Sequence, residues 1–271
     1  MVKTKKGKGI VCFDLDHTLL DNETNEICPS ALTAIEKMRP YYYIVIASGR
    51  DMDNYYSVEF RDIVMPDAII HQNGTKITIG NELYMLHLMD PELVKSIIDY
   101  AQDKGLSVGT TVDGKDYFTH PELKAEADRS YNRFIKRNFV PADELYKLPV
   151  RAMYYSGRND EDDREFLKNF PMLRLLTFSS GRGADLVEKG FSKADGLLRL
   201  CEYYNIPIEN TFAFGDSMND IDIVREAGTG IAVGNAVAEL KAVADLVADD
   251  IRNDGIYKAC ISLGLITEDR R

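Results

Sequence analysis

The sequence predicts an α/β fold, a doubly wound parallel sheet into which a smaller α+β domain is inserted. Short apolar runs alternate with amphipathic segments in the first and last parts of the 271-residue chain, as in βα units around a parallel sheet. The middle part mixes hairpin signals with helices, which is typical of an antiparallel sheet with helices on one face. Because the first and last parts share the same alternation of strand-like and helix-like segments, we place the core at residues 1–84 and 189–271 and the insert at 85–188.

The N-terminal part of the predicted core begins with a buried strand. The apolar run that starts at Ile10 ends in two carboxylates, Asp14 and Asp16. A helix is expected over 29–39, because proline favours the first helical position. The run YYYIVIA, residues 41–47, is typical of a second buried strand.

Two dipeptides mark predicted hairpin turns, Asn73-Gly74 in the core and Asp113-Gly114 in the insert. In the C-terminal part of the core, β-rich runs again alternate with helical segments such as 237–244. The elements expected in the insert are helices at 91–104, 122–136 and 160–170, and strands at 107–112, 117–120, 151–155, 173–178 and 185–188.

Composition and charge argue against several classes of function. The 33 basic and 44 acidic residues give a net charge of −11, which disfavours a nucleic-acid binder. No apolar stretch approaches the roughly 18–20 residues that span a bilayer, and the first apolar run is too short and acidic for a signal peptide. The four cysteines are widely spaced and the histidines lack zinc-site spacing. We therefore expect a cytoplasmic protein without nucleic acid or membrane as a partner; its oligomeric state is not indicated.

Asp14 and Asp16 follow the first strand at the point where it leaves the sheet. Residues two apart in a strand point to the same face, so we expect both carboxylates to converge at the carboxyl edge, where ligands bind in open α/β sheets. Two like charges this close require a proton or a cation between them. The alternative interpretation is an N-cap cluster beside a solvated turn.

Ser48, Gly49 and Arg50 follow the second buried strand. A helix is expected to start there, and its free backbone N–H groups would suit an anion. The alternative interpretation is an ordinary serine N-cap.

Ser192 and Asp195 form a capping-box-like pair, which places Lys193 in the first turn of a helix. A lysine is electrostatically misplaced at the positive end of a helix unless an anion lies in front of it. The alternative is a lysine that faces solvent.

The run from Phe212 again delivers an acid, Asp216, at the end of a strand, with Asn219 and Asp220 just beyond. Oxygen ligands from Asp14 and Asp216 are what Mg²⁺ prefers, with waters completing the octahedron. The alternative is a polar strand-to-helix loop.

All four segments place polar groups after a β-rich run or at a helix start, and a doubly wound sheet brings such ends to one edge. In order and residue type, DLDHTLL, ASGR, FSK and GDSMND resemble the four motifs of the haloacid dehalogenase superfamily of phosphohydrolases. The QNGT turn and the IAVGNAVAELKAVAD stretch also match. The insert is similar in length and position to the type C2B cap of the Cof-like subfamily IIB. This resemblance implies a Rossmann-like core with an inserted α+β cap.

The resemblance also implies a Mg²⁺-dependent phosphomonoester hydrolase whose partner is a small phosphorylated metabolite, with hexose or pentose phosphates foremost. Asp14 would attack phosphorus and form an aspartyl-phosphate, while Asp16 acts as acid and then base and binds the metal through its backbone carbonyl. Asp216 would be a metal ligand, and Asp220 a ligand or an orienting group. The residues expected to hold the phosphate are Ser48, Gly49, Lys193 and Asn219.

Substrate specificity is expected to come from the cap. We assign Arg182, within residues 179–183, and the Asp113-Gly114 hairpin to the substrate lining, although exposed cap turns are an equal alternative. Arg50 is expected to contact the cap or the substrate. Two other functions remain open: a phosphomutase with the same intermediate, and a non-catalytic sensor of a phosphorylated metabolite, which would have no need for Asp16. A purely structural interaction module is the third.

Overall fold

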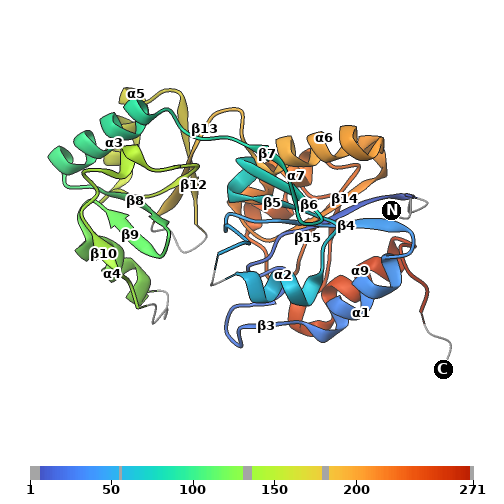
Figure 1. Cartoon of the computed structure of the whole chain (residues 1–271). Helices are drawn as coiled ribbons and strands as arrows, with labels where there is room; N and C mark the ends of the chain where they lie inside the picture. Colours follow the sequence, from blue (N-terminus) through green and yellow to red (C-terminus); the bar gives the residue numbers. More distant parts are fainter. Residues whose placement is uncertain (1–6, 55–56, 131–135, 179–182, 269–271) are drawn as a thin grey trace. The chain divides into compact units, whose positions relative to one another are not determined.

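The computed structural model of the chain describes residues 7–54, 57–130, 136–178 and 183–268 (Figure 1). By its internal contacts the chain divides into two compact units. Met1–Leu86 and Phe191–Arg271 form the core unit, and His87–Gly190 forms the inserted unit.

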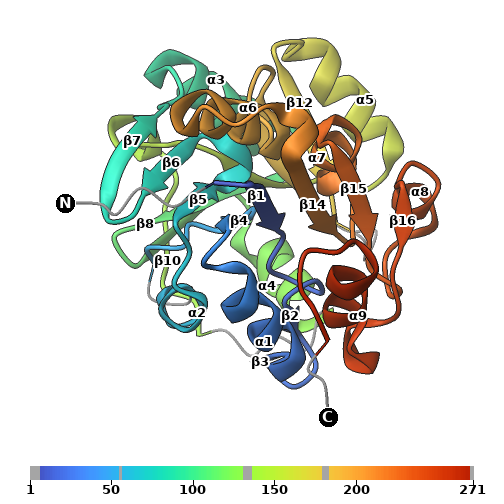
Figure 2. The same cartoon turned by 90° about the vertical axis from the view of Figure 1, so that its right-hand side faces the viewer.

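A mixed sheet forms the centre of the core unit. Its strands are Gly9–Phe13 (β1), Tyr42–Ala47 (β4), Ala68–His71 (β5), Lys76–Ile79 (β6), Glu82–Leu86 (β7), Thr211–Gly215 (β14), Thr229–Ala232 (β15) and Leu246–Val247 (β16). Their order is β16-β15-β14-β1-β4-β5-β6-β7. Neighbours from β16 to β5 pair in parallel, and β6 and β7 add an antiparallel edge. Because β1 lies between β4 and β14, the strand order reverses there, which confirms the doubly wound sheet (Figure 2).

Helices cover both faces of this sheet. Pro29–Met38 (α1), Val58–Val64 (α2) and Gly255–Ser262 (α9) lie on one face, and Lys193–Tyr204 (α6) and Ile221–Glu226 (α7) lie on the other (Figures 1 and 2). The central strands are therefore apolar on both sides, and all of β1 is buried.

Helix α1 shows how the sequence sets this packing. Pro29 occupies the first turn, where its missing N–H costs no hydrogen bond. Ala31, Ala34, Ile35 and Met38 recur at helical spacing and all four are buried. The predicted helix at 29–39 is confirmed.

The inserted unit has its own sheet. Its strands are Ser107–Val112 (β8), Lys115–Phe118 (β9), Phe139–Val140 (β10), Met153–Ser156 (β11), Leu173–Thr177 (β12) and Ala184–Glu188 (β13), and its helices are Pro91–Lys104 (α3), Pro121–Ser130 (α4) and Asp160–Asn169 (α5). The strand order is β10-β9-β8-β11-β13-β12, antiparallel except for the β9–β10 pair. Ile97 of α3 and Phe166 of α5 belong to one apolar cluster with Val108 and Leu186 of the sheet.

The hairpin predicted at Asp113-Gly114 is confirmed, because it joins the antiparallel strands β8 and β9. Both residues have positive φ, 48° and 72°, as a type I′ turn requires. The predicted turn at Asn73-Gly74 likewise joins the antiparallel strands β5 and β6.

The prediction that a helix starts at Ser48 is wrong. Within the described residues after β4, the next helix is α2, which begins at Val58. The Ser48 carbonyl accepts from the Asn73 N–H at 3.1 Å, and the Arg50 carbonyl accepts from the Gln72 N–H at 3.1 Å. The segment is thus bonded to the turn after β5 instead of to a helix of its own.

Other differences concern short elements. The expected helix at 237–244 is reduced to Ala238–Lys241 (α8), and the small hairpin of Leu20–Asp21 (β2) and Glu26–Ile27 (β3) was not foreseen. The helix expected at 122–136 is described only as far as Ser130. Short 3-10 turns lie at Gln72–Gly74 (η1), Leu145–Lys147 (η2), Ile208–Asn210 (η3), Met218–Asp220 (η4) and Ile251–Asn253 (η5).

Candidate active site

Two acids leave neighbouring strands at the carboxyl edge of the core sheet. Asp14 follows β1, and its backbone N–H donates to the Phe214 carbonyl at 2.9 Å. The Phe13 and Phe214 rings stack with centroids 4.9 Å apart, which fixes the ends of β1 and β14 against each other. Asp216 follows Gly215, the last residue of β14. The structure thus brings together the two strand-end acids that the sequence indicated.

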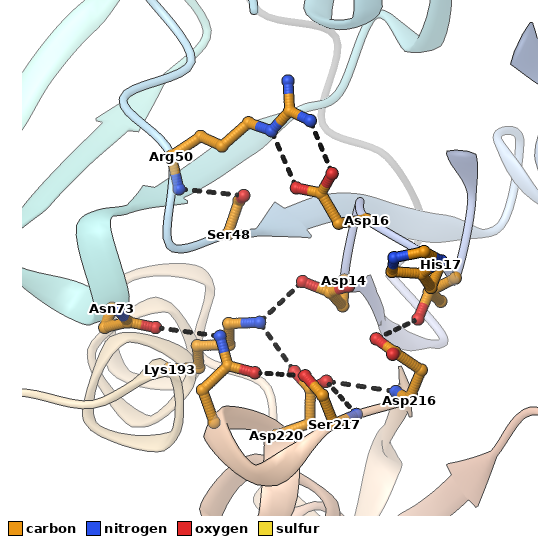
Figure 3. Close-up of polar contacts among 12 residues, drawn as sticks. Asp14, Asp16, His17, Ser48, Arg50, Asn73, Lys193, Asp216, Ser217 and Asp220 are labelled. Atoms are coloured by element: carbon orange, nitrogen blue, oxygen red, sulfur yellow. Dashed lines mark hydrogen bonds and ion pairs between the residues drawn. The ribbon is translucent and has the colours of Figure 1, made fainter. Parts of the chain in front are cut away.

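Lys193 lies among these acids and is 1% exposed, so the solvent-facing alternative is wrong. Its Nζ donates to Asp14 Oδ1 at 2.6 Å and to Asp220 Oδ1 at 2.6 Å (Figure 3). Burial disfavours the lysine cation, but the charges of Asp14 and Asp220 outweigh it and raise the pKa of Lys193. Ser192 caps the helix as expected, since its Oγ accepts from the Asp195 N–H at 3.0 Å.

Asp220 is fully buried, and both of its oxygens are bonded. Oδ1 accepts from Lys193, and Oδ2 accepts from the backbone N–H groups of Asp216 and Ser217, each at 3.1 Å. Space for this carboxylate depends on Gly215, where a Cβ would lie 2.5 Å from the Asp220 Cβ. The side chain therefore ties the loop after β14 to the lysine.

The ionised form of the acids at this edge is disfavoured by burial and by the neighbouring negative charges. Ligand oxygens of Asp14, Asp216 and Asp220 all lie within 4.8 Å of one another. Burial, followed by the neighbouring carboxylates, raises the pKa of Asp216 to about 9; burial is also the main cause that raises the pKa of Asp14 to about 7, although Lys193 opposes the shift. One lysine does not balance three carboxylates, so this donor set fits a divalent cation with oxygen ligands.

Asp16 does not converge with Asp14, contrary to the expectation from strand alternation. Its Oδ1 and Oδ2 accept from Arg50 Nη2 and Nε at 2.5 and 2.7 Å, and Oδ1 also accepts from Asn22 Nδ2 at 2.6 Å (Figure 3). The strand ends at Phe13, so the alternation rule no longer governs Asp16. Burial opposes the cation, yet the charge of Asp16 raises the pKa of Arg50.

Ser48 is buried, and its Oγ accepts from the Arg50 N–H at 3.1 Å. Ser48 lies on the side of the site where Arg50 meets Asp16 (Figure 3). Gly49 follows it in the bend after β4. Arg50, expected from the sequence to contact the cap or the substrate, forms an ion pair with Asp16 within the core unit.

Asn73 is a site residue that the sequence reasoning treated only as part of a turn. It is 0% exposed with φ of +53°, and its Oδ1 accepts from Asn219 Nδ2 at 3.5 Å. Ser217 Oγ donates to Asn219 Oδ1 at 2.7 Å, so the Asn219 amide is held at both ends. A Cβ at Gly74 would lie 2.2 Å from the Ser192 carbonyl oxygen, so this turn packs directly on the start of α6.

Asn22 and Thr18 were also missed. Thr18 Oγ1 donates to Asp216 Oδ1 at 3.4 Å, and Asn22 contacts Asp16. Thr18 lies within the first motif and Asn22 just beyond it, in a segment where only the acids carried a chemical signal. Arg182, assigned to the substrate lining, lies outside the described residues.

A second acidic group in the core unit is Asp51 and Asp53 beside His71. Lys76 Nζ already lies 3.2 Å from Asp51 Oδ1 and 2.6 Å from Asp53 Oδ2, and Arg61 pairs with Asp53 at 2.7 Å. These side-chain cations balance the group.

A sequence profile of the haloacid dehalogenase-like hydrolases matches residues 11–260, most of the chain. The chain belongs to this family. As a family member it is a phosphatase that acts on phosphorylated small molecules, and the resemblance drawn from its four motifs is confirmed.

Relatives of this phosphatase carry related activities in their names. The 5-amino-6-(5-phospho-D-ribitylamino)uracil phosphatase YcsE of Bacillus subtilis (strain 168) is 39% identical over 252 residues, which cover 92% of this chain and 93% of YcsE. The putative phosphatase YkrA of the same strain is 26% identical over 263 residues, 95% of this chain and 98% of YkrA.

Solved structures agree with the fold. The subclass IIB sugar phosphatase BT4131 is 28% identical, with a TM-score of 0.83 over 95% of this chain and 100% of that one. The phosphatase BT1666 of Bacteroides thetaiotaomicron, 24% identical, has a TM-score of 0.87 over 98% of each chain and supports the fold alone. None of the helices within the described residues has both the length and the apolar character that crossing a membrane demands.

Proposed function

We propose that this phosphatase is a Mg²⁺-dependent phosphomonoesterase that releases phosphate from a sugar phosphate through an aspartyl-phosphate on Asp14. The observation that carries the proposal is the contact of Lys193 with Asp14 inside a buried acidic cluster. A buried carboxylate beside a cation is suited to nucleophilic attack on a phosphoryl group whose charge the same cation offsets.

The donor set supports a divalent metal at this edge of the sheet. Asp14 and Asp216 would supply carboxylate oxygens, and Asp16 its backbone carbonyl. Since both oxygens of Asp220 already accept hydrogen bonds, we assign Asp220 chiefly to orienting Lys193 and the loop, and Asp14 and Asp216 to binding the metal. When bound, Mg²⁺ would neutralise charge on the phosphoryl oxygens.

In the proposed mechanism, Asp14 and Asp16 carry out two successive chemical steps. In the first, an oxygen of Asp14 forms a bond to phosphorus as the ester oxygen leaves, and Asp16 gives that oxygen a proton. In the second, Asp16 takes a proton from the water that cleaves the aspartyl-phosphate. We assign the non-reacting phosphoryl oxygens to the Ser48 hydroxyl, the Gly49 N–H, Lys193 and Asn219.

The substrate class rests on the named relatives. YcsE and YitU of Bacillus subtilis are named as phosphatases of 5-amino-6-(5-phospho-D-ribitylamino)uracil, and BT4131 as a sugar phosphatase. All three names contain a phosphorylated sugar or sugar alcohol. We propose a substrate of this kind, and we place the activity in the cytoplasm because the four cysteines are unpaired.

The test is a phosphate-release screen of the purified protein with Mg²⁺. The panel contains hexose and pentose phosphates, 5-amino-6-(5-phospho-D-ribitylamino)uracil, pyridoxal phosphate and nucleotides, and Asp14→Asn serves as the blank. We expect release from at least one sugar phosphate and none from the variant. Undiminished release by Asp14→Asn would overturn the nucleophile.

Two other outcomes of this screen have a defined meaning. Isomerised product without free phosphate would show a phosphomutase, and tight binding without turnover would show a sensor. The inserted unit is tested through Arg182→Ala: unchanged specificity constants over the panel would remove Arg182 from the substrate lining.

A further inference from the structure

Two side chains, Arg50 and Asn22, hold the Asp16 carboxylate through three hydrogen bonds. Arg50 donates to both of its oxygens from one planar guanidinium, at 2.5 and 2.7 Å, and Asn22 donates to Oδ1 at 2.6 Å. The Asp16 and Arg50 side chains are 27% and 24% exposed, so water competes only partly with these bonds. Paired bonds from a guanidinium fix the plane of a carboxylate as well as its position.

Both partners are themselves fixed by the core unit. The Arg50 N–H donates to Ser48 Oγ within the same bend, and the Arg50 carbonyl accepts from the Gln72 N–H, so the backbone of Arg50 is tied to the turn after β5. The guanidinium carbon lies 5.7 Å from the centre of the Phe60 ring, which supports its face. Arg50 is therefore anchored before it contacts Asp16.

Asn22 connects the same carboxylate to the loop that carries it. Its Oδ1 accepts from the His17 N–H at 2.8 Å while its Nδ2 donates to Asp16. His17 has φ of +57°, a conformation that is uncommon for a residue with a side chain. Asn22 thus couples the direction of the Asp16 side chain to the strained turn that follows it.

We propose that Arg50 and Asn22 are positioning residues for proton transfer by Asp16. They direct this carboxylate away from the acidic cluster of Asp14 and Asp216 and hold it in one orientation. The inference rests on the proposed function, in which Asp16 protonates the leaving oxygen. It gives Arg50 a role that acts through Asp16, in addition to the contact with the cap or the substrate expected from the sequence.

The test compares leaving groups of similar shape. 4-Nitrophenyl phosphate has a leaving group that departs without a proton, whereas benzyl phosphate releases an alkoxide that needs one. The measured quantity is the ratio of kcat/KM for the two esters, since kcat/KM includes the first phosphoryl transfer and excludes the later hydrolysis of the intermediate. Asp16→Asn removes the proton donor completely and gives the reference effect: we expect kcat/KM to fall about 100-fold on benzyl phosphate and much less on 4-nitrophenyl phosphate.

Arg50→Ala and Asn22→Ala are expected to lose about 10-fold in kcat/KM on benzyl phosphate and less than about 3-fold on 4-nitrophenyl phosphate. Added guanidinium should restore part of the loss in Arg50→Ala. Arg39→Ala is the matched control, because Arg39 pairs with Glu36 and with the Val64 and Met65 carbonyls at the end of α2. It should leave the ratio unchanged.

Equal losses on both esters in Arg50→Ala would overturn the inference and indicate a contact with the phosphate or a general structural role. An unchanged ratio in both variants would also overturn it. If Arg50→Ala does not fold, Arg50→Lys and Asn22→Ala give the same comparison, because lysine cannot make the paired bonds. Failure of the proposed function looks different: Asp14→Asn would remain active, or Asp16→Asn would keep the wild-type ratio.

Discussion

The Nζ atom of Lys193 lies 2.6 Å from Oδ1 of Asp14, although 179 residues separate them in the chain. The first residue of helix α6 and the residue that follows strand β1 thus form a buried ion pair. Asp14 and Lys193 are both buried, so water cannot replace either partner of this pair.

Replacing Lys193 by Met should remove activity almost completely and destabilise the fold. Breaking a buried ion pair leaves an uncompensated charge and costs about 3–5 kcal/mol. Phosphate release and thermal unfolding measure the two effects. Lys258→Met is the control, since that lysine forms an exposed pair with Asp249 and should keep full activity. Wild-type turnover by Lys193→Met would contradict the site described here.

Mg²⁺ should raise the melting temperature, and Asp216→Asn should abolish that rise. The pKa of Asp216 is raised in the folded protein, so without metal the native state holds protons that the unfolded state has released. Metal-free stability should therefore fall as pH rises from about 4, the ordinary carboxyl pKa, towards 9.

Thermal scans across this pH range, with Mg²⁺ and with a chelator, check the sign. Metal-free Asp216→Asn should show a flatter profile than the wild type. A metal-free wild-type protein that gains stability between pH 5 and 9 (about the range set by the pKa shift) would contradict the electrostatic description.

Gly215→Ala should lower kcat by roughly 10-fold or more, because a Cβ there would lie 2.5 Å from the Asp220 Cβ and displace the carboxylate that orients Lys193. Gly114→Ala in the inserted unit is the matched control. Its Cβ would meet nothing within 4 Å, so only the positive φ of 72° strains it. Gly114→Ala should lower the stability slightly and leave kcat unchanged.

Asp21→Asn should lower the melting temperature at neutral pH by about 1–2 °C. Hydrogen bonds from Arg252 are the main cause that lowers the pKa of Asp21 to about 2. A carboxyl whose pKa is lower in the folded state stabilises the protein above its ordinary pKa and loses this effect as pH falls towards the folded value. The difference between variant and wild type should thus disappear near pH 2, in paired scans from pH 7 downwards.

The strand-end acids and the lysine were predictable from the sequence because each depends on one local rule. An apolar run ending in Asp14 or Asp216 predicts a carboxylate at the carboxyl edge of a sheet. The Ser192 cap then places Lys193 at the start of a helix, and its unfavourable charge there indicates an anion nearby.

The features of the site that the sequence did not predict depend on contacts between segments far apart in the chain. The helix expected at Ser48 is replaced by backbone bonds to the turn after β5, which no local pattern encodes. The same turn brings Asn73 to Asn219, although Asn-Gly by itself indicates only a hairpin. The direction of Asp16 is set by Arg50, 34 positions later, and not by the strand before it.

The central place of β1 has a consequence for synthesis. β1 pairs on one side with β4, which follows soon after it, and on the other with β14, which lies beyond the entire inserted unit. During synthesis, one edge of this hydrophobic strand therefore stays unpaired until β14 has been made. Such exposed edges favour aggregation and slow, non-local closure, so acquisition of the native state should depend on release of the C-terminal third from the ribosome.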